Sequence, residues 1–523
     1  MRPRRLLRWL RRLAFVVAIA ALGVLAARLS FPLPSLDGRV PSQAIAASES
    51  TALGAGISLV AAEHPGLSGV ASLRRGPDAF GARVTLARAA ESSIDAQYYI
   101  WQRDVTGFLL LDELRAAAER GVRVRLLLDD VGTAGLDAEL AALDALPNFE
   151  VRLFNPFTLR TLRSAGYLFD VVRLNRRMHN KAFTVDGAVT IVGGRNVGDI
   201  YFARAAEGHY SDFDVLVVGP AAAEVSTDFD AYWASASAYP VNLLVEPSEG
   251  GLDSLREAVA GAASDPAAEV FLDAVEASTL VPGLKAGAAG LDWVAARLLS
   301  DDPAKALGLA GKDEILMARL SEEMGRSVRG LDLISAYFIP GRRGAALLAG
   351  LAEQGLRVRI LTNSLESTDV PPVHSGYVEY RDELLDAGVE LYEMKSTTVP
   401  REDADHFGVL ASATSSLHAK VLTIDGERVF VGSFNFDPRS FFLNCEMGIL
   451  IDSVAIASEF DGIFDERVRV NAYRVIRAED GGTEWIETLP DGGEVTYGSE
   501  PRTTFLERAA VAVIGWLPVD WML

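Results

Sequence analysis

The 523-residue chain contains a single cysteine, Cys445, and only six histidines. One cysteine excludes an intramolecular disulfide and a cysteine-ligated zinc cluster, and its position also excludes a lipid-modified cysteine near the N-terminus. Basic residues are scarce too: 50 Lys and Arg stand against 71 Asp and Glu, the formal net charge is −21, and no basic tract follows Arg12. Non-specific nucleic-acid binding relies on a basic surface that releases counterions from phosphates, so we expect no nucleic-acid partner.

Hydrophobic residues make up 49% of the chain and charged residues 23%, which is typical of a folded globular protein. A chain of this length is too long for one ordinary core. It predicts two to four domains or one large duplicated unit.

The N-terminus departs from the acidic average. Six arginines precede the uncharged run LAFVVAIAALGVLAA, residues 13–27. Fifteen residues suit the core of a signal peptide and are short for a membrane span of about 20 residues. However, Leu6, Leu7, Trp9 and Leu10 can lengthen the apolar face while the arginines reach the interface, and the nearest A-x-A site, at 44–46, lies far downstream. We therefore favour a retained anchor in residues 1–30 over a cleaved signal, with the arginines cytoplasmic and the rest of the chain across the membrane.

The chain contains an internal repeat. Residues 179–196 read HNKAFTVDGAVTIVGGRN and residues 418–435 read HAKVLTIDGERVFVGSFN, with His, Lys, Thr, Asp, Gly, Val, Gly and Asn at identical offsets. Upstream, GVRVRLLL (121–128) matches GLRVRILT (355–362), and SIDAQYYIW (93–101) matches DLISAYFIP (332–340) with Tyr98 opposite Tyr337. Several similar blocks in the same order indicate a duplicated domain.

Each half alternates strand-like and helix-like segments. In the first half we expect strands at 93–101, 122–128 and 151–154 and helices at 107–120 and 136–146, followed by a hairpin. This order predicts the α/β class, with two duplicated lobes of sheet flanked by helices. The predicted segments are an anchor or signal (1–30), a linker (31–70), lobe 1 (71–240), a helical insertion (241–325), lobe 2 (326–475) and a C-terminal tail (476–523).

Two of these segments leave alternatives open. The insertion is either a lid or a second packing layer. The tail, which contains Trp516 and Trp521, is either a helix packed on the body or a contact with lipid.

The repeated hairpins bring two basic side chains together. Residues i and i+2 of a strand point to the same face, so His179 projects with Lys181 and His418 with Lys420. Other residues recur at fixed places in both hairpins. These are the Asp-Gly pairs that begin at Asp186 and Asp425, where tight turns are expected, and Asn196 and Asn435, which follow the small residues Gly194 and Ser433. A ligand can come close to small residues, so Gly194 and Ser433 are expected substrate contacts.

Two imidazoles and two lysines suit a phosphodiester substrate. An imidazole can act as a nucleophile or a general acid, and a lysine can neutralise the non-bridging oxygens. A single His-x-Lys is usually incidental, so the inference depends on the pair. The roles of Asp186 and Asp425 are open between the catalytic set and the turn, and Asp214 and Glu446 follow the hairpins at positions that suit orienting an imidazole.

The pattern HxKxxxxD followed by G-[GS]-x-N, present twice, resembles the phospholipase D superfamily over residues 90–475. YYIWQRDVTGFLLLDELRAAAERGVRVRLLLDD and GSFNFDPRSFFLNCEMG are similar to its bacterial cardiolipin-synthase-like branch. The resemblance implies mixed sheets in two lobes related by a pseudo-twofold axis, an active site between them, and no metal or other cofactor. It also implies a phosphatidyl group carried on a histidine and then transferred to an alcohol, which places the protein at the bacterial inner membrane with phospholipid substrates.

The resemblance implies a role for each matched residue. His179 is the expected nucleophile and His418 the general acid, while Lys181 and Lys420 bind phosphate with help from Asn196 and Asn435. Tyr377 and Arg381 match the family's GY-x-x-YR stretch, so they are expected either to contact substrate or to pack a helix. Several relatives of this branch carry a lipid-modified cysteine that this N-terminus lacks, a departure that concerns membrane attachment.

Three functions are consistent with such a chain. The favoured one is a phosphatidyltransferase that makes cardiolipin from phosphatidylglycerol and a second phospholipid. A hydrolase or nuclease on the same scaffold is the alternative, and the net charge of −21 argues against a nuclease. A non-catalytic scaffold protein would predict a decayed motif in one half, but both motifs are intact.

Overall fold

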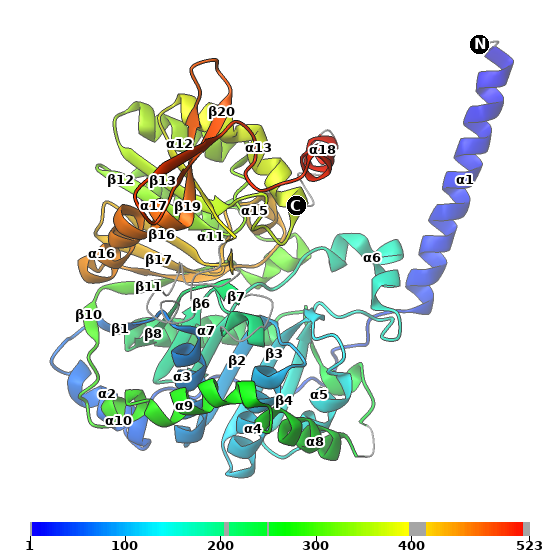
Figure 1. Cartoon of the computed structure of the whole chain (residues 1–523). Helices are drawn as coiled ribbons and strands as arrows, with labels where there is room; N and C mark the ends of the chain where they lie inside the picture. The colour runs from blue at the N-terminus through cyan, green and yellow to red at the C-terminus, as the bar shows by residue number, and fades with distance from the viewer. Residues whose placement is uncertain (1–2, 203–208, 248–249, 397–414, 516–523) are drawn as a thin grey trace.

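The computed structural model describes residues 3–202, 209–247, 250–396 and 415–515. Two lobes lie one above the other, each with a mixed β-sheet and helices on its outer face, and a long N-terminal helix extends from the body (Figure 1). The predicted α/β class with two duplicated lobes is confirmed. The expected strand and helix order of the first half is also confirmed, as β2 (Ser93–Ile100), α4 (Val105–Glu119), β3 (Arg123–Gly132), α5 (Asp137–Asp144) and β4 (Phe149–Phe154).

The first lobe contains a nine-stranded sheet in which β2, β3 and β4 are parallel and β5, β6, β8 and β1 follow one another antiparallel. In spatial order the strands are β10 (Asp292–Val294), β1 (Ser68–Leu73), β8 (Asp214–Val218), β6 (Val189–Gly193), β5 (Ala182–Val185), β2 (Ser93–Ile100), β3 (Arg123–Gly132), β4 (Phe149–Phe154) and β9 (Ala238–Pro240).

The second lobe contains a ten-stranded sheet with the same central pattern: β12, β13 and β14 are parallel, and β16 pairs antiparallel with β12. In spatial order the strands are β11 (Ala296–Ser300), β18 (Met447–Ile451), β17 (Arg428–Gly432), β16 (Lys420–Ile424), β12 (Gly330–Ser335), β13 (Arg357–Asn363), β14 (Glu390–Met394), β19 (Ala472–Arg477), β20 (Thr483–Thr488) and β21 (Glu494–Tyr497).

The strand register corrects one match of the repeat. Ile94 of β2 pairs with Val185, and Leu331 of β12 pairs with Ile424, which is the counterpart of Val185. Ile94 is therefore the counterpart of Leu331, so the alignment of β2 with β12 differs by two residues from the predicted match. The prediction of Tyr98 opposite Tyr337 is wrong. Sequence similarity between short apolar strands does not determine register, whereas backbone pairing does.

The two sheets face each other across a shared apolar core. Val192 and Val217 of the first lobe and Val431 and Ile449 of the second belong to one buried cluster. A short parallel pair, β7 (His209–Ser211) with β15 (Ser415–Leu417), also joins the lobes. Burial of β-branched side chains from both sheets thus holds the two hairpins face to face.

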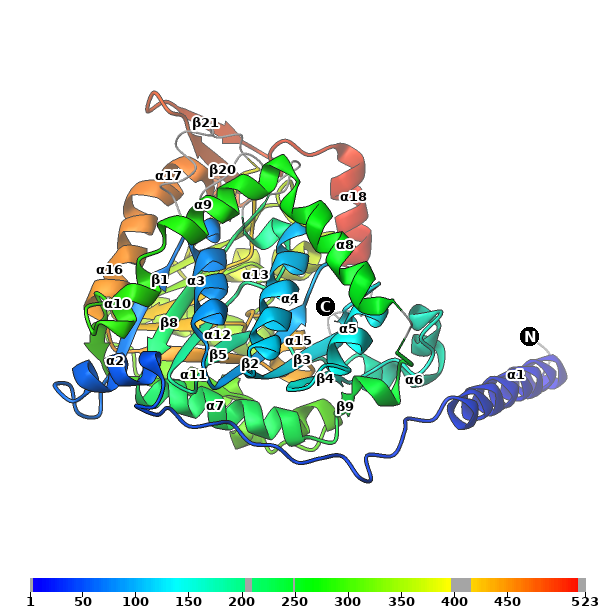
Figure 2. The ribbon, with the colours of Figure 1, turned by 90° about the horizontal axis from the view of Figure 1, so that it is seen from below.

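Helices cover the outer face of each sheet. On the first lobe these are α3 (Gly76–Ala89), α4 (Val105–Glu119) and α5 (Asp137–Asp144), and on the second they include α11 (Leu316–Gly325), α12 (Gly341–Glu353) and α13 (Pro371–Asp386). Within the predicted insertion, α8 (Gly251–Ala263) packs on α4 and α9 (Glu269–Ala277) packs on α3, as Figure 2 shows from below. These helices form a second packing layer, while β10 and β11 add an edge strand to each sheet.

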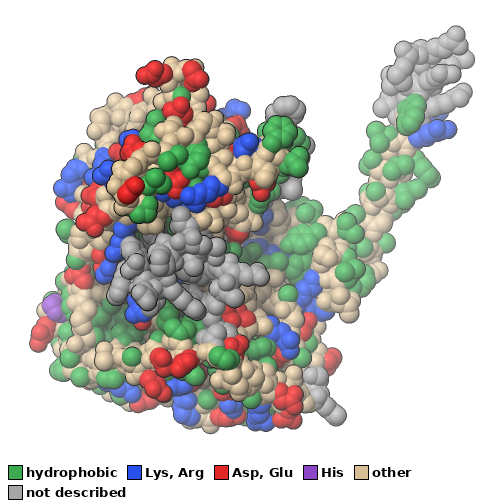
Figure 3. Space-filling view, in the orientation of Figure 1, with side chains coloured by type: hydrophobic (Ala, Val, Ile, Leu, Met, Phe, Trp, Pro, Cys, Tyr) green, Lys and Arg blue, Asp and Glu red, His purple; other side chains and the backbone are tan. Residues whose placement is uncertain are grey.

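The N-terminal helix α1 (Pro3–Ser30) contains a 20-residue segment, Arg11–Ser30, that is long and apolar enough to cross a membrane. Its base contacts α6 (Tyr167–Leu174), because Arg28 donates a 2.6 Å hydrogen bond to the Phe169 carbonyl and Phe31 stacks on the Phe169 ring. In the tail, α18 (Phe505–Ile514) packs on α13 yet leaves Phe505 and Leu506 exposed. Trp516 and Trp521 lie outside the described residues. Figure 3 shows apolar side chains along α1 and on α18.

Candidate active site

The two His-Lys motifs meet at the interface between the lobes. Each motif precedes its hairpin and is docked by a backbone hydrogen bond to the opposite lobe: the His179 N–H donates to the Cys445 carbonyl and the His418 N–H to the Ser211 carbonyl, both at 2.8 Å. All four motif side chains, His179, Lys181, His418 and Lys420, are buried. The structure therefore brings together the four residues that the sequence paired.

A carboxylate of the second lobe orients His179. Its Nδ1 lies 2.8 Å from Glu446 Oε2 and 3.0 Å from the Ser433 carbonyl oxygen. Both partners are acceptors, so Nδ1 carries the hydrogen and Nε2 keeps a lone pair. This places Glu446 where the sequence suggested, behind an imidazole.

Glu446 is itself held firmly. Ser433 Oγ donates to Oε2 at 2.5 Å, Ser440 Oγ donates to Oε1 at 2.9 Å, and the Glu446 N–H donates to Asp301 Oδ2 at 2.9 Å. A fully hydrogen-bonded carboxylate in a buried site keeps its charge and position. Ser440 and Asp301 had no recognisable signal in the sequence.

The first lobe supplies the matching carboxylate for His418, but it is Asp212 rather than Asp214. Asp212 Oδ2 lies 2.6 Å from His418 Nδ1. Asp214 instead forms an ion pair with Arg83 at 2.8 Å and lies 3.5 Å from Arg195. The backbone explains the error, because Ser211 and Cys445 dock the two motifs equivalently, and the residue after each of them is the one that reaches the imidazole.

Gly194 makes room for this carboxylate. A Cβ atom on Gly194 would lie 2.1 Å from Asp212 Oδ1, far inside van der Waals contact. The equivalent residue in the second lobe is Ser433, which contacts Glu446 by a hydrogen bond instead. These two positions, predicted as substrate contacts, support the imidazole partners.

The lysines lie against the histidine backbones. Lys181 Nζ donates to the His179 carbonyl at 2.6 Å, and Lys420 Nζ donates to the His418 carbonyl and lies 3.2 Å from His418 Nδ1. An ammonium group has three hydrogens, which leaves donors on each lysine for a phosphate oxygen.

Burial sets the protonation of the site. It lowers the pKa of His179 to about 4, with Lys181 and Lys420 adding to the shift and Glu446 opposing it. Burial likewise lowers the pKa of His418 to about 4, reinforced by Lys420 and opposed by Asp212. Each lysine thus lowers the pKa of the histidine in its own motif, and it also lowers the pKa of the histidine in the opposite lobe. With its substrate absent, the site holds neutral imidazoles at neutral pH.

The pKa values of the two lysines and of Asp212 are shifted as well. Burial lowers the pKa of Lys181 to about 7 and also lowers that of Lys420. Burial would raise the pKa of Asp212, but His418, Lys420 and Arg195 outweigh it and lower that pKa to about 2. Such perturbed groups gathered at one place are typical of a functional site.

Aromatic rings that the sequence motifs did not indicate surround the imidazoles. Tyr99 packs edge-on against His179 with ring centroids 4.8 Å apart, and Tyr210 stacks on His418 at 4.9 Å. The hydroxyls of Tyr210 and Tyr337 both donate to Asp369 Oδ2 at 2.9 Å, which links the two lobes beside His418. Aromatic residues are too common in apolar strands to have identified this group.

The two asparagines lie at the ends of the returning strands. Asn196 Oδ1 accepts the Ile100 N–H at 3.1 Å, and this contact fixes the end of β2. Asn435 is buried, and its Oδ1 has no hydrogen-bond partner among the described residues. This oxygen can only accept a hydrogen bond, so it suits a ligand hydroxyl, whereas binding a phosphate oxygen depends on the Asn435 Nδ2 group.

The structure places Asp186 and Asp425 at the hairpin turns, away from the imidazoles. Both have φ values in the left-handed region, 53° and 60°, as do the glycines that follow them, which a type I′ turn requires. The Asp186 carboxylate accepts the N–H groups of residues 91–93 at the start of β2. The Asp425 carboxylate accepts those of residues 328–330 at the start of β12 and the Ser327 hydroxyl. These contacts assign the aspartates to the scaffold rather than to the catalytic set.

Tyr377 and Arg381 lie on α13, in the interior of the second lobe, which favours the helix-packing alternative over substrate contact. Arg381 bridges Glu500 at 2.7 Å and Glu393 at 3.3 Å, and Tyr377 is buried. With His374, the two glutamates form a group whose atoms are close enough to hold a metal ion. The guanidinium of Arg381 already lies between these carboxylates, so the group is better suited to fastening the tail to α13 than to binding a cation.

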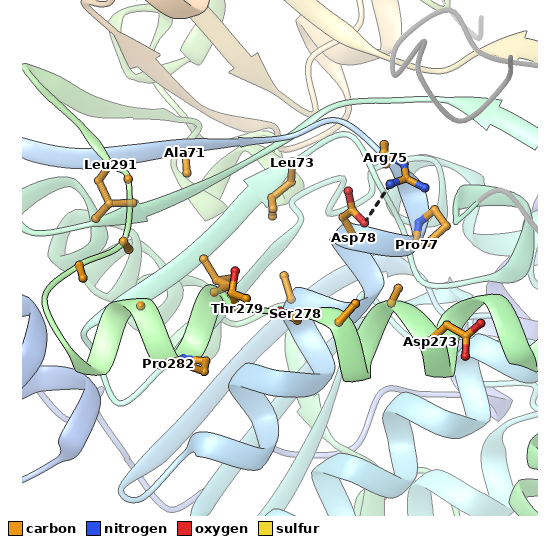
Figure 4. Close-up of a pocket in the computed structure, with 18 of the residues that line it drawn as sticks. Ala71, Leu73, Arg75, Pro77, Asp78, Asp273, Ser278, Thr279, Pro282 and Leu291 are labelled. Carbon is orange, nitrogen blue, oxygen red and sulfur yellow. Dashed lines mark ion pairs between the residues drawn. The ribbon is translucent and has the colours of Figure 1, made fainter.

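A cavity of about 770 Å³ lies in the first lobe between α3 and the helices α9 and α10 (Leu280–Lys285) (Figure 4). Its lining is largely apolar and includes the Arg75–Asp78 ion pair at 3.8 Å. Neither His-Lys motif contributes to that lining as described. The chemistry therefore belongs to the lobe interface and not to this cavity.

The geometry supports one type of reaction. Each imidazole has a carboxylate behind Nδ1, which leaves Nε2 for the substrate, and two lysines face the same space. One imidazole can attack phosphorus while the other transfers a proton to or from the departing oxygen.

Comparison with known proteins agrees with this geometry. The family described as "Cardiolipin synthase, PLD-like domain" matches residues 84–233 and 320–468. The cardiolipin synthase C of Escherichia coli (strain K12) is 45% identical over 461 residues, which cover 88% of this chain and 97% of that protein. An uncharacterized protein of Helicobacter pylori (strain ATCC 700392 / 26695) is 32% identical over 454 residues, 85% of this chain and 88% of that protein.

The crystal structure of phosphatidylserine synthase from Haemophilus influenzae Rd KW20 shares the fold, with a TM-score of 0.55 and 16% identity over 90% of this chain and 100% of that chain. The family matches cover both His-Lys motifs and more than half of the chain. The resemblance predicted from the paired motifs is thus confirmed, and the chain belongs to the phospholipase D superfamily as a member of the cardiolipin synthase, PLD-like domain family.

Proposed function

We propose that this protein is a phosphatidyltransferase that forms cardiolipin from phosphatidylglycerol and a second phospholipid. The observation that carries the proposal is the pair of buried imidazoles, each backed by a carboxylate of the opposite lobe at 2.6–2.8 Å. The 45% identity to the cardiolipin synthase C of Escherichia coli supports this choice of substrate.

In the first step, Nε2 of His179 attacks the phosphorus of the donor lipid. A P–N bond forms, the P–O bond to the leaving alcohol breaks, and His418 gives its Nε2 proton to the departing oxygen. Glu446 stabilises the positive charge that develops on His179, and Lys181 and Lys420 neutralise the non-bridging oxygens. His179 is assigned as the nucleophile because two acceptors hold its Nδ1 hydrogen.

In the second step, the hydroxyl of the acceptor lipid loses its proton to Nε2 of His418. Its oxygen attacks phosphorus, the P–N bond breaks, and both histidines return to their initial states. Transfer wins over hydrolysis where water is excluded from the phosphohistidine, and burial of all four motif side chains supports this outcome.

The charges of the site explain why an anionic substrate activates it. In the substrate complex, the anionic phosphate favours the protonated form of Lys181 and Lys420, whose charges balance the carboxylates of Asp212 and Glu446. A phosphodiester adds one negative charge, which one imidazolium balances. Substrate binding therefore raises the pKa of one histidine and supplies the general acid that the site without substrate lacks.

We further propose that α1 anchors the protein in a bacterial inner membrane, with the lobes on the extracytoplasmic side and a surface that does not bind nucleic acid. The arginines before the apolar segment support this orientation, and the net charge of −21 argues against nucleic acid. A reporter fused to the C-terminus, compared in activity on the two sides of the membrane, tests it; reporter activity in the cytoplasm would contradict the orientation.

The test of the function is reconstitution of the purified full chain in vesicles that contain phosphatidylglycerol, with and without phosphatidylethanolamine. We expect cardiolipin to accumulate and glycerol or another head-group alcohol to be released, both measurable by mass spectrometry. Release of phosphatidic acid without cardiolipin would favour a hydrolase. Cleavage of oligonucleotides with unchanged lipids would favour a nuclease, and either result would overturn the proposal.

A further inference from the structure

A second cavity, of about 720 Å³, adjoins the active site. It lies between α11, the start of α12, and α15 (Pro438–Phe442), and Arg176 of the first lobe closes one side. Ligand cavities of several hundred Å³ are large enough for a substantial organic group. Its wall is mostly apolar, with Met317, Ala318, Leu347 and Phe441 among the residues that line it.

The cavity shares a wall with the catalytic centre. Lys305 lines it, and its Nζ donates to the Ser440 carbonyl at 2.9 Å. Ser440 in turn donates through Oγ to Glu446, which orients His179. Arg176 is only three residues from His179 along the chain. The short helix α15 therefore has one side in the cavity and the other in the site.

Two arginines give the rim of the cavity a positive charge. Arg342 and Arg343 line it and are exposed, and no ion pair or hydrogen bond joins either guanidinium to another described residue. Four basic residues and one acidic residue line the cavity in a chain whose net charge is −21. A basic rim above an apolar hollow is complementary to a lipid with an anionic phosphate and an acyl chain.

The surface beside the cavity is also apolar. Phe442 is 68% exposed and lines the cavity. Leu309, which lies in the chain between the lining residues Gly308 and Ala310, is 74% exposed. The neighbouring helix α6 exposes Leu168 and Val172 and contacts the base of α1. The surface between the cavity and the base of α1 is thus apolar. A lipid can therefore enter the cavity from the bilayer without crossing water.

We propose that this cavity binds the acceptor phospholipid, with an acyl chain in the hollow and the phosphate at Arg342 and Arg343. The inference rests on the proposed function, because a transfer between two lipids needs a place for the second lipid while the first phosphatidyl group occupies His179. The catalytic centre itself has one pair of lysines for one phosphate. The second lipid therefore takes its own phosphate contacts outside that centre.

The first test measures acceptor selectivity. One donor lipid is supplied, and kcat/KM is compared for long-chain phosphatidylglycerol and for glycerol as acceptors. In Ala318→Phe the added ring fills the hollow, so the ratio of lipid to glycerol should fall at least about tenfold, the effect of losing about two buried methylenes. Ala455→Phe, on the exposed face of α16 (Val454–Gly462), is the matched control and should leave the ratio unchanged.

The arginines are tested in the same assay. The double variant Arg342→Gln and Arg343→Gln should lower the ratio for the anionic lipid, whereas Arg469→Gln with Arg474→Gln, an equal charge change at exposed positions, should not. A ratio that stays constant in Ala318→Phe and in the arginine double variant would overturn the inference.

The second test does not depend on turnover. Phosphatidylglycerol with a photoreactive diazirine on its acyl chain is added to the full chain in vesicles, and labelled peptides are mapped. We expect label in residues 305–321 and 438–442, reduced in Ala318→Phe and retained in Ala455→Phe. Label confined to α1 and α18 would overturn the inference. If the cavity is labelled and no phosphatidyl transfer occurs to any acceptor, the proposed function fails while the lipid site stands.

Discussion

Replacement of Asp212 by asparagine isolates the contact that the sequence did not predict. Asp212 and His418 are both buried, and their atoms lie 2.6 Å apart. Asparagine has the same shape but no charge, so it cannot stabilise the imidazolium form of His418. Its amide can also donate to Nδ1, which moves the imidazole hydrogen to Nε2, as in the serine-protease variant that lost about 10⁴-fold in kcat.

The expected size follows from the burial of the pair. In the substrate complex His418 is protonated and forms a buried ion pair with Asp212, and breaking such a pair on one side costs about 3–5 kcal/mol. At about 1.4 kcal/mol for each tenfold change in rate, Asp212→Asn should lower kcat about 10²- to 10⁴-fold. The pH profile should change as well. A general acid must carry its proton, so activity falls as pH rises through the pKa of His418 in the complex; loss of the carboxylate lowers that pKa and moves this limb to lower pH.

Asp214→Asn is the matched control, since Asp214 is two residues away and pairs with Arg83 instead. This variant should lose about 3–5 kcal/mol of unfolding free energy but keep kcat of the folded protein within about tenfold. The assay is cardiolipin formation in vesicles, together with thermal unfolding of each variant. The role of Asp212 is refuted if Asp212→Asn keeps kcat within tenfold of the unmodified protein. It is also refuted if Asp214→Asn lowers the kcat of the folded protein by more than about tenfold.

Three further outcomes are expected. His179→Ala and His418→Ala should each lower cardiolipin formation by at least about 10²-fold, and chelators should leave the unmodified protein's activity unchanged; activity that EDTA removes and a divalent ion restores would contradict this. Gly194→Ala puts a Cβ 2.1 Å from the carboxylate that holds His418, so kcat should fall, whereas Gly261→Ala in α8, where the Cβ has open space, should not lower it. Asp425→Ala removes the acceptor of several backbone N–H groups, so the unfolding free energy should drop by about 2–4 kcal/mol with kcat of the folded protein nearly unchanged; equal stability in calorimetry would contradict the scaffold role.

The hairpins could be predicted because their signals are local. An Asp-Gly pair selects the turn, β-branched residues form the strands, and a histidine two residues before a lysine places both side chains on one face. A single His-x-Lys is a weak signal, but the whole pattern recurs 239 residues later, and this repetition made the prediction of a site specific. Local geometry and site chemistry coincide in these segments, so the sequence was sufficient for His179, Lys181, His418 and Lys420.

The partners of the imidazoles depend on how the lobes dock, which is not a local property. The stretch SDFD offers two aspartates on the same side of the chain, and only the docking of Ser211 against the His418 N–H selects Asp212. Glu446 was found because NCEMG offers one acidic residue. The sequence left two roles open for Arg381 for a related reason: its carboxylate partners, Glu393 and Glu500, come from a distant strand and from the tail.

The proposed reaction requires a covalent phosphatidyl group on His179, with His418 as the proton donor and acceptor. The most direct measurement is acid-free peptide mapping by mass spectrometry after the protein is mixed with phosphatidylglycerol and denatured during turnover. We expect a phosphatidyl adduct on the peptide that contains His179 and none on the peptide that contains His418. An adduct on His418, or a protein that forms cardiolipin with neither histidine ever modified, would contradict it.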